Sequence, residues 1–393
     1  MAPIPPPWKR PTSVLMVAGF PPPAHGSSHM NARLHTILAT SPELDLTAIR
    51  LGRPKVVSEV GALSPRSVLY DTRTLLCLAS RRLGWRRWDV AYLAISQQKP
   101  ALFRDVLVWR LLLSLADRVI VHVHGGELPH AVRGVLAPVA RRLGRRTEFW
   151  ILSAKLGLGD FASAFPGARA IEVVPNATEC ACVCAPKTVG SDEVRVGYLG
   201  TVRTEKGVTT LLEGVRLLAH DASLRDRLSS QRIRATFELA GPARPLELRV
   251  EVERSCAEIN EIGGPVISAR YLGSVDSQER CRLLGRWDAV ALISNFNLEG
   301  QPLALIEAAA HHCAIISNEY RALTDVNVDG VTGWVVEGGR HATAPDVARV
   351  LRDAVTEPSE LRARGLEAAK LAQERFSAEA FRERVLGLLG KAK

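Results

Sequence analysis

The 393-residue sequence predicts an α/β protein of two Rossmann-like domains, each built on a parallel sheet covered by helices. Short apolar runs alternate with helical stretches along the whole chain, a pattern typical of parallel sheets. The chain is long enough for two domains with full hydrophobic cores. A polar segment without helical or strand periodicity, 176–193, separates the two halves. These three observations predict the fold class before any single motif is considered.

The predicted strands are short and apolar. In the first half they are 14–19, 90–95, 119–124, 148–152 and 171–174. In the second half they are 194–199, 235–240, 266–272, 289–293, 314–317 and 334–336. We place the first domain at residues 1–185, the second at 186–375, and a terminal helical segment at 376–393. Ligands of such sheets bind beyond the carboxyl ends of the strands, so the loops that follow these strands are the candidate site.

Charge is distributed unevenly between the halves. Residues 1–190 contain 24 Lys and Arg against 12 Asp and Glu, whereas residues 191–393 contain 27 against 29. A basic first half suits an anionic partner such as a membrane surface, a lipid phosphate or nucleic acid, although a merely arginine-rich composition would give the same count. No uncharged apolar run reaches the length of a membrane span. The helix predicted at 101–115 is amphipathic. Its apolar side is expected either to pack on the sheet or to lie on a membrane.

The seven cysteines do not form a recognisable framework. Cys77, Cys256, Cys281 and Cys313 are scattered through apolar or helical surroundings, which favours reduced thiols in a cytoplasmic protein. Three more alternate at 180, 182 and 184, without the spacing of a zinc site. We therefore expect no metal.

Two carboxylates, Glu299 and Glu307, flank a predicted helix start after the strand at 289–293. Pro302 suits the first helical position, because the missing N–H costs nothing there. Backbone N–H groups around this start would bind a phosphate or a polar sugar. The donors are Gly300, Gln301, Leu303 and Ala304, because Pro302 has no N–H. The two acids would contact separate parts of one extended ligand, such as a sugar nucleotide. A capping acid followed by a surface Glu would produce the same spacing.

Other loops carry further candidate ligands. Gly200 follows the first strand of the second half, and Arg203 and Lys206 come after it at a predicted helix start, where cations and the helix dipole favour one anion. A solvated basic turn is the alternative reading. Gly26 and Ser27 lie in a loop that precedes a helix expected to start at Asn31. This loop would approach phosphate through backbone N–H groups, or would be an ordinary turn.

Two histidines share one face of a predicted strand in the first half. His122 is expected in the core, and His124 stands at the carboxyl end of the strand, where binding residues collect. No third ligand for a metal accompanies this pair.

The segment 295–307, followed by Ala314-Ile315-Ile316-Ser317, resembles the E-x7-E signature of retaining GT-B glycosyltransferases of family 4, and Glu-Gly-Gln-Pro is similar to members that build bacterial surface polysaccharides. The resemblance covers about residues 14–390 and is strongest in 194–336. Asp329-Gly330 to Gly333 and the first-domain ending Pro175-Asn176 resemble structural turns of that family. Lys206-Gly207 also match, but Thr201 occupies the position of the family's arginine, which leaves Arg203 as a substitute.

The resemblance implies a GT-B fold in which the two domains face each other across a cleft, with the last helix crossing back towards the first domain. It implies that Glu299 and His124 contact the donor sugar, that Glu307 contacts the ribose, and that Lys206 contacts the diphosphate. Gly26 would allow close approach of the diphosphate or acceptor. His312 replaces a glycine and is expected in a left-handed turn.

The function that follows is transfer of a sugar from a nucleoside-diphosphate sugar (UDP-, GDP- or related) to a glycan or lipid-linked acceptor, in surface polysaccharide or glycolipid biosynthesis. We expect no cofactor, no nucleic-acid partner, and a cytoplasmic protein in peripheral contact with an anionic membrane through its basic half. Two alternatives remain open. One is a basic binding protein with a decayed catalytic cleft, and the other is a GT-B sugar-nucleotide hydrolase or epimerase that uses no acceptor.

Overall fold

The computed structural model describes residues 10–22, 25–52, 65–81, 84, 87–178 and 192–390. The chain divides into two compact units, one formed by residues 1–176 with 382–393 and the other by residues 177–381. The predicted boundary between 185 and 186, like Cys180, Cys182 and Cys184, lies outside the described residues.

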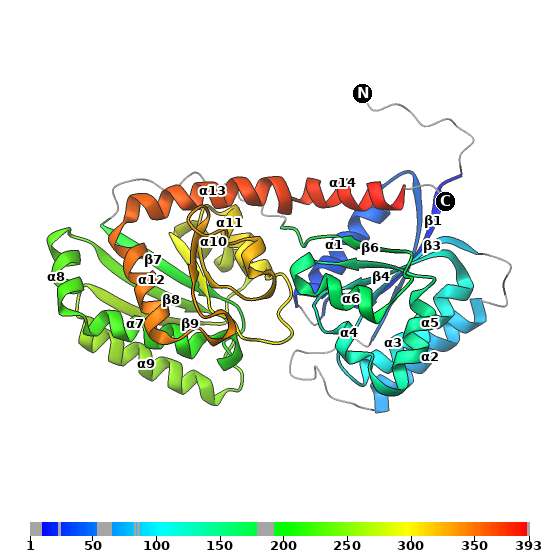
Figure 1. Ribbon diagram of the computed structural model, residues 1–393, viewed down its shortest axis with the longest axis horizontal. Coiled ribbons are helices and arrows are strands. Elements are labelled where there is room, and N and C mark those ends of the chain that lie inside the picture. Colours follow the sequence, from blue (N-terminus) through cyan, green and yellow to red (C-terminus); the bar gives the residue numbers. More distant parts are fainter. Residues whose placement is uncertain are drawn as a thin grey trace, which may run out of the picture. The chain divides into compact units, whose positions relative to one another are not determined.

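The first unit is a six-stranded parallel sheet with the order β2-β1-β3-β4-β5-β6. Its strands are β1 Thr12–Ala18, β2 Leu44–Arg50, β3 Trp88–Ile95, β4 Ala116–Val123, β5 Glu148–Ile151 and β6 Ala170–Val173. Its helices are α1 Gly26–Thr40, α2 Pro65–Arg81, α3 Ala101–Leu115, α4 Leu128–Ala131, α5 Ala137–Gly144, α6 Leu158–Ala164 and, from Arg382 on, α14 Ala378–Leu389, with short 3-10 turns at Gly134–Leu136 and Ala154–Leu156. Helices α2, α3 and α5 form one layer, in which α3 contacts both neighbours (Figure 1).

The second unit repeats this plan with the order β12-β11-β10-β7-β8-β9. Its strands are β7 Glu193–Leu199, β8 Arg234–Ala240, β9 Ile267–Gly273, β10 Ala289–Leu292, β11 Ala314–Asn318 and β12 Gly333–Val336. Its helices are α7 Val208–His220, α8 Ala222–Ser230, α9 Glu247–Gly263, α10 Ser277–Arg286, α11 Leu303–Ala310, α12 Ala344–Thr356 and α13 Pro358–Phe376, with 3-10 turns at Thr204–Lys206, Arg321–Asp325 and Gly339–His341. Figure 1 shows helices on both faces of this sheet, with α7 and α9 on one side and α10 and α11 on the other.

Both sheets bury their strands because helices cover both faces, so the strands read as continuous apolar runs. Each unit has its own hydrophobic core. The expected α/β fold of two parallel sheets is therefore confirmed, as is the helix at 101–115, whose Leu102, Val106, Trp109 and Leu113 are buried. In the part of the chain that is described, no helix is both long and apolar enough to cross a membrane.

The sequence prediction missed strand β2. Its residues Leu44–Arg50 are mostly half-buried, since β2 is the edge strand of the first sheet. Asp45, Thr47 and Arg50 interrupt the apolar run by which the other strands were recognised. The structure also begins α1 at Gly26, whereas the sequence placed that helix start near Asn31.

Three local predictions have definite outcomes. His312 has a φ of +59°, which confirms the left-handed turn. Gly330 has a φ of +72° in the turn before β12, and Asp329 accepts a hydrogen bond there from the N–H of Val335, so this motif is structural as expected. The expectation of reduced cysteines is wrong for Cys281, which is disulfide-bonded, while Cys77, Cys256 and Cys313 are free.

Candidate functional site

An acid and a cation from two neighbouring strands meet at the carboxyl edge of the second sheet. Glu299 follows β10 and Lys206 follows β7, and these strands are paired. Nζ of Lys206 lies 2.8 Å from Oε2 and 3.0 Å from Oε1 of Glu299. The Glu299 residue is only 4% exposed, and Oγ of Ser294 donates to its Oε2 at 2.9 Å. The carboxylate is thus held in place by a cation and a hydroxyl.

The position of Lys206 depends on the glycine that follows it. Gly207 has a φ of +72°, and a Cβ built there would lie 1.6 Å from the carbonyl oxygen of Ile293 at the end of β10. Only glycine accommodates both the left-handed backbone and this contact. The N–H of Asn295 also donates to the carbonyl oxygen of Glu205 at 2.9 Å. These contacts hold the loop after β7 against the loop after β10.

Phe296 lies between the two cations that the sequence singled out. Its ring centroid is 5.4 Å from Cζ of Arg203 and 5.5 Å from Nζ of Lys206. Such distances allow a cation–π interaction with each residue. Arg203 is also 3.4 Å from the carboxylate of Glu205, in an exposed ion pair. Arg203 therefore shares a platform with Lys206 although it is displaced by two residues from the expected position.

The loops after β7 and β8 are also tied together. Gly200 has a φ of +145°, and its N–H donates to the carbonyl of Ala240 at 3.0 Å. A Cβ on Gly241 would lie 1.8 Å from the carbonyl oxygen of Gly200. The hydroxyl of Tyr198 donates to the carbonyl of Thr201 at 2.8 Å. Thr201 thus takes part in closing the loop, at the position where the family has arginine.

The start of α11 differs from the prediction by one residue. Pro302 is the N-cap with extended backbone, and the helix begins at Leu303. Gln301 is buried, and its Nε2 donates to Asp325 at 3.0 Å. Glu307, on the second turn, has Oε2 3.5 Å from Nε of Arg280 on α10.

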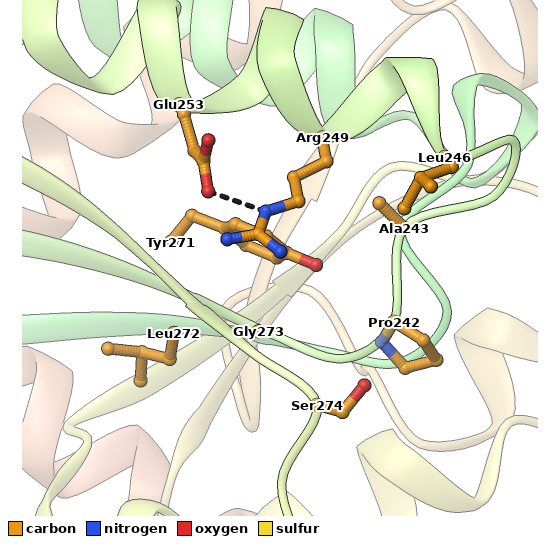
Figure 2. A pocket seen from close by; sticks show the side chains of 9 residues that line it. All are labelled: Pro242, Ala243, Leu246, Arg249, Glu253, Tyr271, Leu272, Gly273 and Ser274. Atoms are coloured by element: carbon orange, nitrogen blue, oxygen red, sulfur yellow. Dashed lines mark hydrogen bonds and ion pairs between the residues drawn. The ribbon is translucent and has the colours of Figure 1, made fainter.

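A hollow of about 250 Å³ opens at the carboxyl ends of β8 and β9 (Figure 2). Tyr271 and the Arg249–Glu253 ion pair of α9 line it on one side. Its other lining residues are Pro242, Ala243, Leu246, Leu272, Gly273 and Ser274. The hollow lies on the same edge of the sheet as Lys206 and Glu299, since β7 pairs with β8 and β8 with β9.

His124 follows β4 in the first unit with neither ring nitrogen hydrogen-bonded, as far as the described residues go, although both nitrogens are buried. Burial, with a smaller effect from His25, lowers the pKa of His124 to about 4. Its ring stacks on His122 with centroids 4.2 Å apart. Nδ1 of His122 is 2.8 Å from the Tyr92 hydroxyl, and His122 is 1% exposed, so its expected place in the core is confirmed. His124 is therefore a neutral imidazole whose donor and acceptor are both unused.

The first loop of this unit forms a helix cap. His25 is the N-cap of α1, and its Nδ1 accepts from the N–H of Ser28 at 3.2 Å and lies 3.0 Å from Oγ of Ser27. Gly26 is exposed in the first turn. The capping histidine explains why the helix starts five residues before the predicted point.

The structure brings Lys206, Glu299 and Arg203 together. It places Gly200 and Gly300 in loops of the same edge, where Leu303 begins α11. Gln301 is turned inward, away from a ligand role for its side chain. Gly26, Ser27 and His124 belong to the other unit. Sequence reasoning missed Ser294, Phe296 and Arg280. The alternation of polar and apolar residues after β10 was the available signal for Phe296, and nothing marked Arg280.

Among the described residues, no group of three or more His, Cys, Asp or Glu is arranged to hold a metal ion. The cations of this edge are side chains. What they can do chemically is bind an anion beside a carboxylate that accepts hydrogen bonds.

Comparison with known proteins agrees with this geometry. Residues 193–353 match the sequence family described as glycosyl transferases group 1. The match lies within the second unit. No curated protein sequence matches the chain.

Solved structures match over nearly the whole length. Anabaena HepE, in complex with UDP and glucose, has a TM-score of 0.64 and 16% identity over 97% of this chain and 100% of its own. Sucrose-phosphate synthase from Thermosynechococcus elongatus has a TM-score of 0.68 and 14% identity over 96% and 98%. The lipopolysaccharide outer core galactosyltransferase WaaB has a TM-score of 0.66 and 14% identity over 97% and 100%. The fold is GT-B, and with the group 1 domain it supports a glycosyltransferase.

Proposed function

We propose that the protein is a retaining glycosyltransferase that moves a sugar from a nucleoside-diphosphate sugar to a glycan or lipid-linked acceptor, in surface polysaccharide or glycolipid biosynthesis. The observation that carries the proposal is the ion pair of half-buried Lys206 with buried Glu299, at the carboxyl edge of the second sheet and within the residues that match the group 1 family. HepE, which shares the fold, is described with UDP and glucose and also with UDP-glucose, and this supports a nucleotide sugar as donor.

The pair suits the charge that develops during transfer. Breaking the bond at the anomeric carbon leaves positive charge on the sugar and negative charge on the departing diphosphate. A lysine ammonium has three N–H donors. Two of those of Lys206 point to the carboxylate oxygens of Glu299, so the third remains for a phosphate oxygen. Arg203, positioned on the same Phe296 ring, would add a second cation. These side chains would carry the leaving-group charge, and we expect transfer to persist in the presence of EDTA.

Glu299 would bind the sugar rather than attack it. A carboxylate only accepts hydrogen bonds, and the sugar offers hydroxyl donors. The pairing with Lys206 and Ser294 fixes the orientation of this acceptor. In the first unit, the neutral and unpaired imidazole of His124 would bind another sugar hydroxyl. Retention would then follow from attack on the same face of the sugar, assisted by the departing phosphate.

The remaining parts of the edge suit the nucleoside. Glu307 would accept from ribose hydroxyls once it exchanges Arg280 for the ligand. The N–H groups at the start of α11, including those of Gly300 and Leu303, would bind the diphosphate. The hollow lined by Tyr271 and Gly273 would receive the base. The proposed acceptor is a glycan or a lipid-linked acceptor.

A panel of nucleotide sugars tested with the full chain examines the proposal. We expect one donor to raise the unfolding temperature and to support transfer to a glycan or polyprenyl-diphosphate acceptor, with the anomeric configuration retained by NMR. Lys206→Ala should lower kcat at least a hundredfold, because a donor to the leaving charge is lost.

Three results would contradict the proposal. Inverted product would exclude the retaining mechanism. Release of nucleotide at full rate without any acceptor would favour a hydrolase or epimerase. Failure to bind any nucleoside diphosphate, with fold intact, would favour a decayed binding protein.

A further inference from the structure

Exposed apolar side chains concentrate on two helices of the first unit. Helices α2 and α3 carry five of the thirteen large hydrophobic residues that are exposed in the described part of the chain. Val68, Leu69 and Leu76 on α2 are 55–63% exposed, and Phe103 and Leu107 on α3 are 43% and 53% exposed. Single exposed apolar residues are ordinary, but a cluster of this kind marks a binding surface.

The two helices that carry these five residues pack against each other. Asp71 of α2 and Arg104 of α3 form an ion pair at 3.1 Å. Val68 precedes Asp71 by three residues, and Leu107 follows Arg104 by three, so each is the neighbour of a bridge residue on its own helix. Phe103 and Leu107 are four residues apart and share one stripe of α3. We call this surface the α2–α3 face.

The α2–α3 face carries cations and no available acid. The two acids of these helices, Asp71 and Asp105, both pair with Arg104. Arg66, Arg73 and Arg110 are exposed, and the described residues provide none of them with an ion-pair partner. Nζ of Lys99, just before α3, lies 5.8 Å from the ring centroid of Phe103. Apolar side chains surrounded by unpaired cations are the composition of a surface that lies on an anionic membrane.

We propose that the α2–α3 face docks on an anionic lipid membrane, with its leucines and Phe103 entering the interfacial region and its arginines contacting lipid phosphates. The cations suit either an anionic membrane or nucleic acid, and the exposed aliphatic side chains favour the membrane. Nucleic acid is bound through stacking aromatics and phosphate contacts and does not need aliphatic side chains. The proposal goes beyond the transfer reaction and does not depend on it, since membrane binding is measured without donor or acceptor.

The test is co-sedimentation of the full chain with two kinds of vesicle. One contains phosphatidylcholine alone, and the other also contains about 30% phosphatidylglycerol, which is anionic. We expect binding to the anionic vesicles only. Replacing Arg66, Arg73 and Arg110 with Ala should lower the partition constant on the order of a hundredfold, at about fivefold for each arginine. Leu69→Gln with Leu76→Gln should lower it roughly tenfold without changing the charge.

Matched controls come from the second unit. Arg270→Ala with Arg340→Ala removes two exposed arginines, and Val250→Gln with Leu366→Gln removes two exposed apolar side chains. Both should bind vesicles as the unmodified chain does. Absence of binding to anionic vesicles would overturn the proposal, as would equal losses in the control variants. The proposal would also be overturned if the chain bound a short oligonucleotide but not vesicles, and if the arginine replacements weakened that oligonucleotide binding.

Discussion

Glu299 shows how one residue combines stability and chemistry. A carboxylate that is 4% exposed needs compensation, and Lys206 and Ser294 supply it. Removing one partner of a buried pair leaves an unpaired charge, so loss of Lys206 would disturb the site even without a ligand. The same contacts keep the carboxylate oriented, which is what an acceptor of sugar hydroxyls requires.

Phe296 provides a test of the two-cation arrangement. Phe296→Leu keeps an apolar side chain but removes the ring face beneath Arg203 and Lys206. Each cation–π contact at a partly exposed site is worth about 0.5–1 kcal/mol, so losing both should raise the Kd of the nucleoside diphosphate about five- to thirtyfold. Calorimetry measures this change. Phe296→Tyr retains the ring and should bind as the unmodified chain does; equal weakening in both variants would refute the platform role.

His124 predicts a dependence of stability on pH. Its pKa of about 4 in the folded chain lies below the unfolded value of 6.5. The unfolded state therefore binds more protons between pH 6.5 and pH 4, and stability falls as the pH is lowered through that window. From pH 7 to pH 5 the loss from this residue is about 2 kcal/mol.

Urea unfolding of the unmodified chain and of His124→Gln at both pH values measures this effect. The variant should lose less stability on acidification, by about the amount given above. His122 titrates in the same direction, because burial also lowers its pKa, and it remains in both proteins. Identical pH dependence in the two proteins would show that His124 is not held neutral by the fold.

At the scale of elements, the site consists of loops fastened to one another at the edge of the sheet. Gly207 packs against the carbonyl of Ile293, and Gly241 packs against the carbonyl of Gly200. These close approaches connect the loop after β7 to its neighbours on both sides. The loops can therefore hold cations and an acid at fixed distances although none of them is regular secondary structure.

Gly207 and Gly330 form a matched pair for testing this construction. Both have a φ of +72°, but a Cβ meets a backbone oxygen at 1.6 Å at Gly207 and open space at Gly330. Gly330→Ala should cost about 1–2 kcal/mol from backbone strain alone. Gly207→Ala should cost more and should also abolish nucleotide binding, because β7 and β10 loops must separate. Thermal unfolding and calorimetry distinguish the two effects, and similar losses in both variants would refute the close-contact argument.

At the scale of the whole molecule, two units with separate cores divide the properties of the chain. The first unit carries the excess of basic residues and the α2–α3 face, and the second carries the acid–cation pair and the group 1 domain. We therefore expect a nucleoside diphosphate without a sugar to bind only to the second unit.

Hydrogen exchange measures that division. We expect UDP or GDP to slow exchange of amides in 200–207 and 299–305, because these loops would bind the diphosphate. Amides in 116–131 of the first unit should exchange as before. Protection confined to the first unit would place the nucleotide elsewhere and would remove the proposed role of Lys206.

Much of the architecture could be read from the sequence because buried parallel strands are continuous apolar runs. Ten of the eleven predicted strands differ from the observed bounds by no more than two residues at either end. The remaining one, 119–124, starts three residues after the observed start of β4. Strand β2 escaped detection because Asp45, Thr47 and Arg50 interrupt its apolar run. Motif spacing likewise pointed to Glu299 and Lys206, since residues that follow adjacent parallel strands meet at one edge.

Sequence alone determined the fold class, the alternation of strands and helices, the charge difference between the halves and the acids and cations of the second half. Only the tertiary structure decided that Lys206 pairs with Glu299, that Phe296 supports Arg203, that Arg280 reaches Glu307 and that Gln301 turns inward to Asp325. The reason is physical. Periodicity reports which face of an element is buried, whereas the side-chain partners in this site, such as Lys206 and Glu299, come from segments as much as 93 residues apart that meet only when the sheet is assembled.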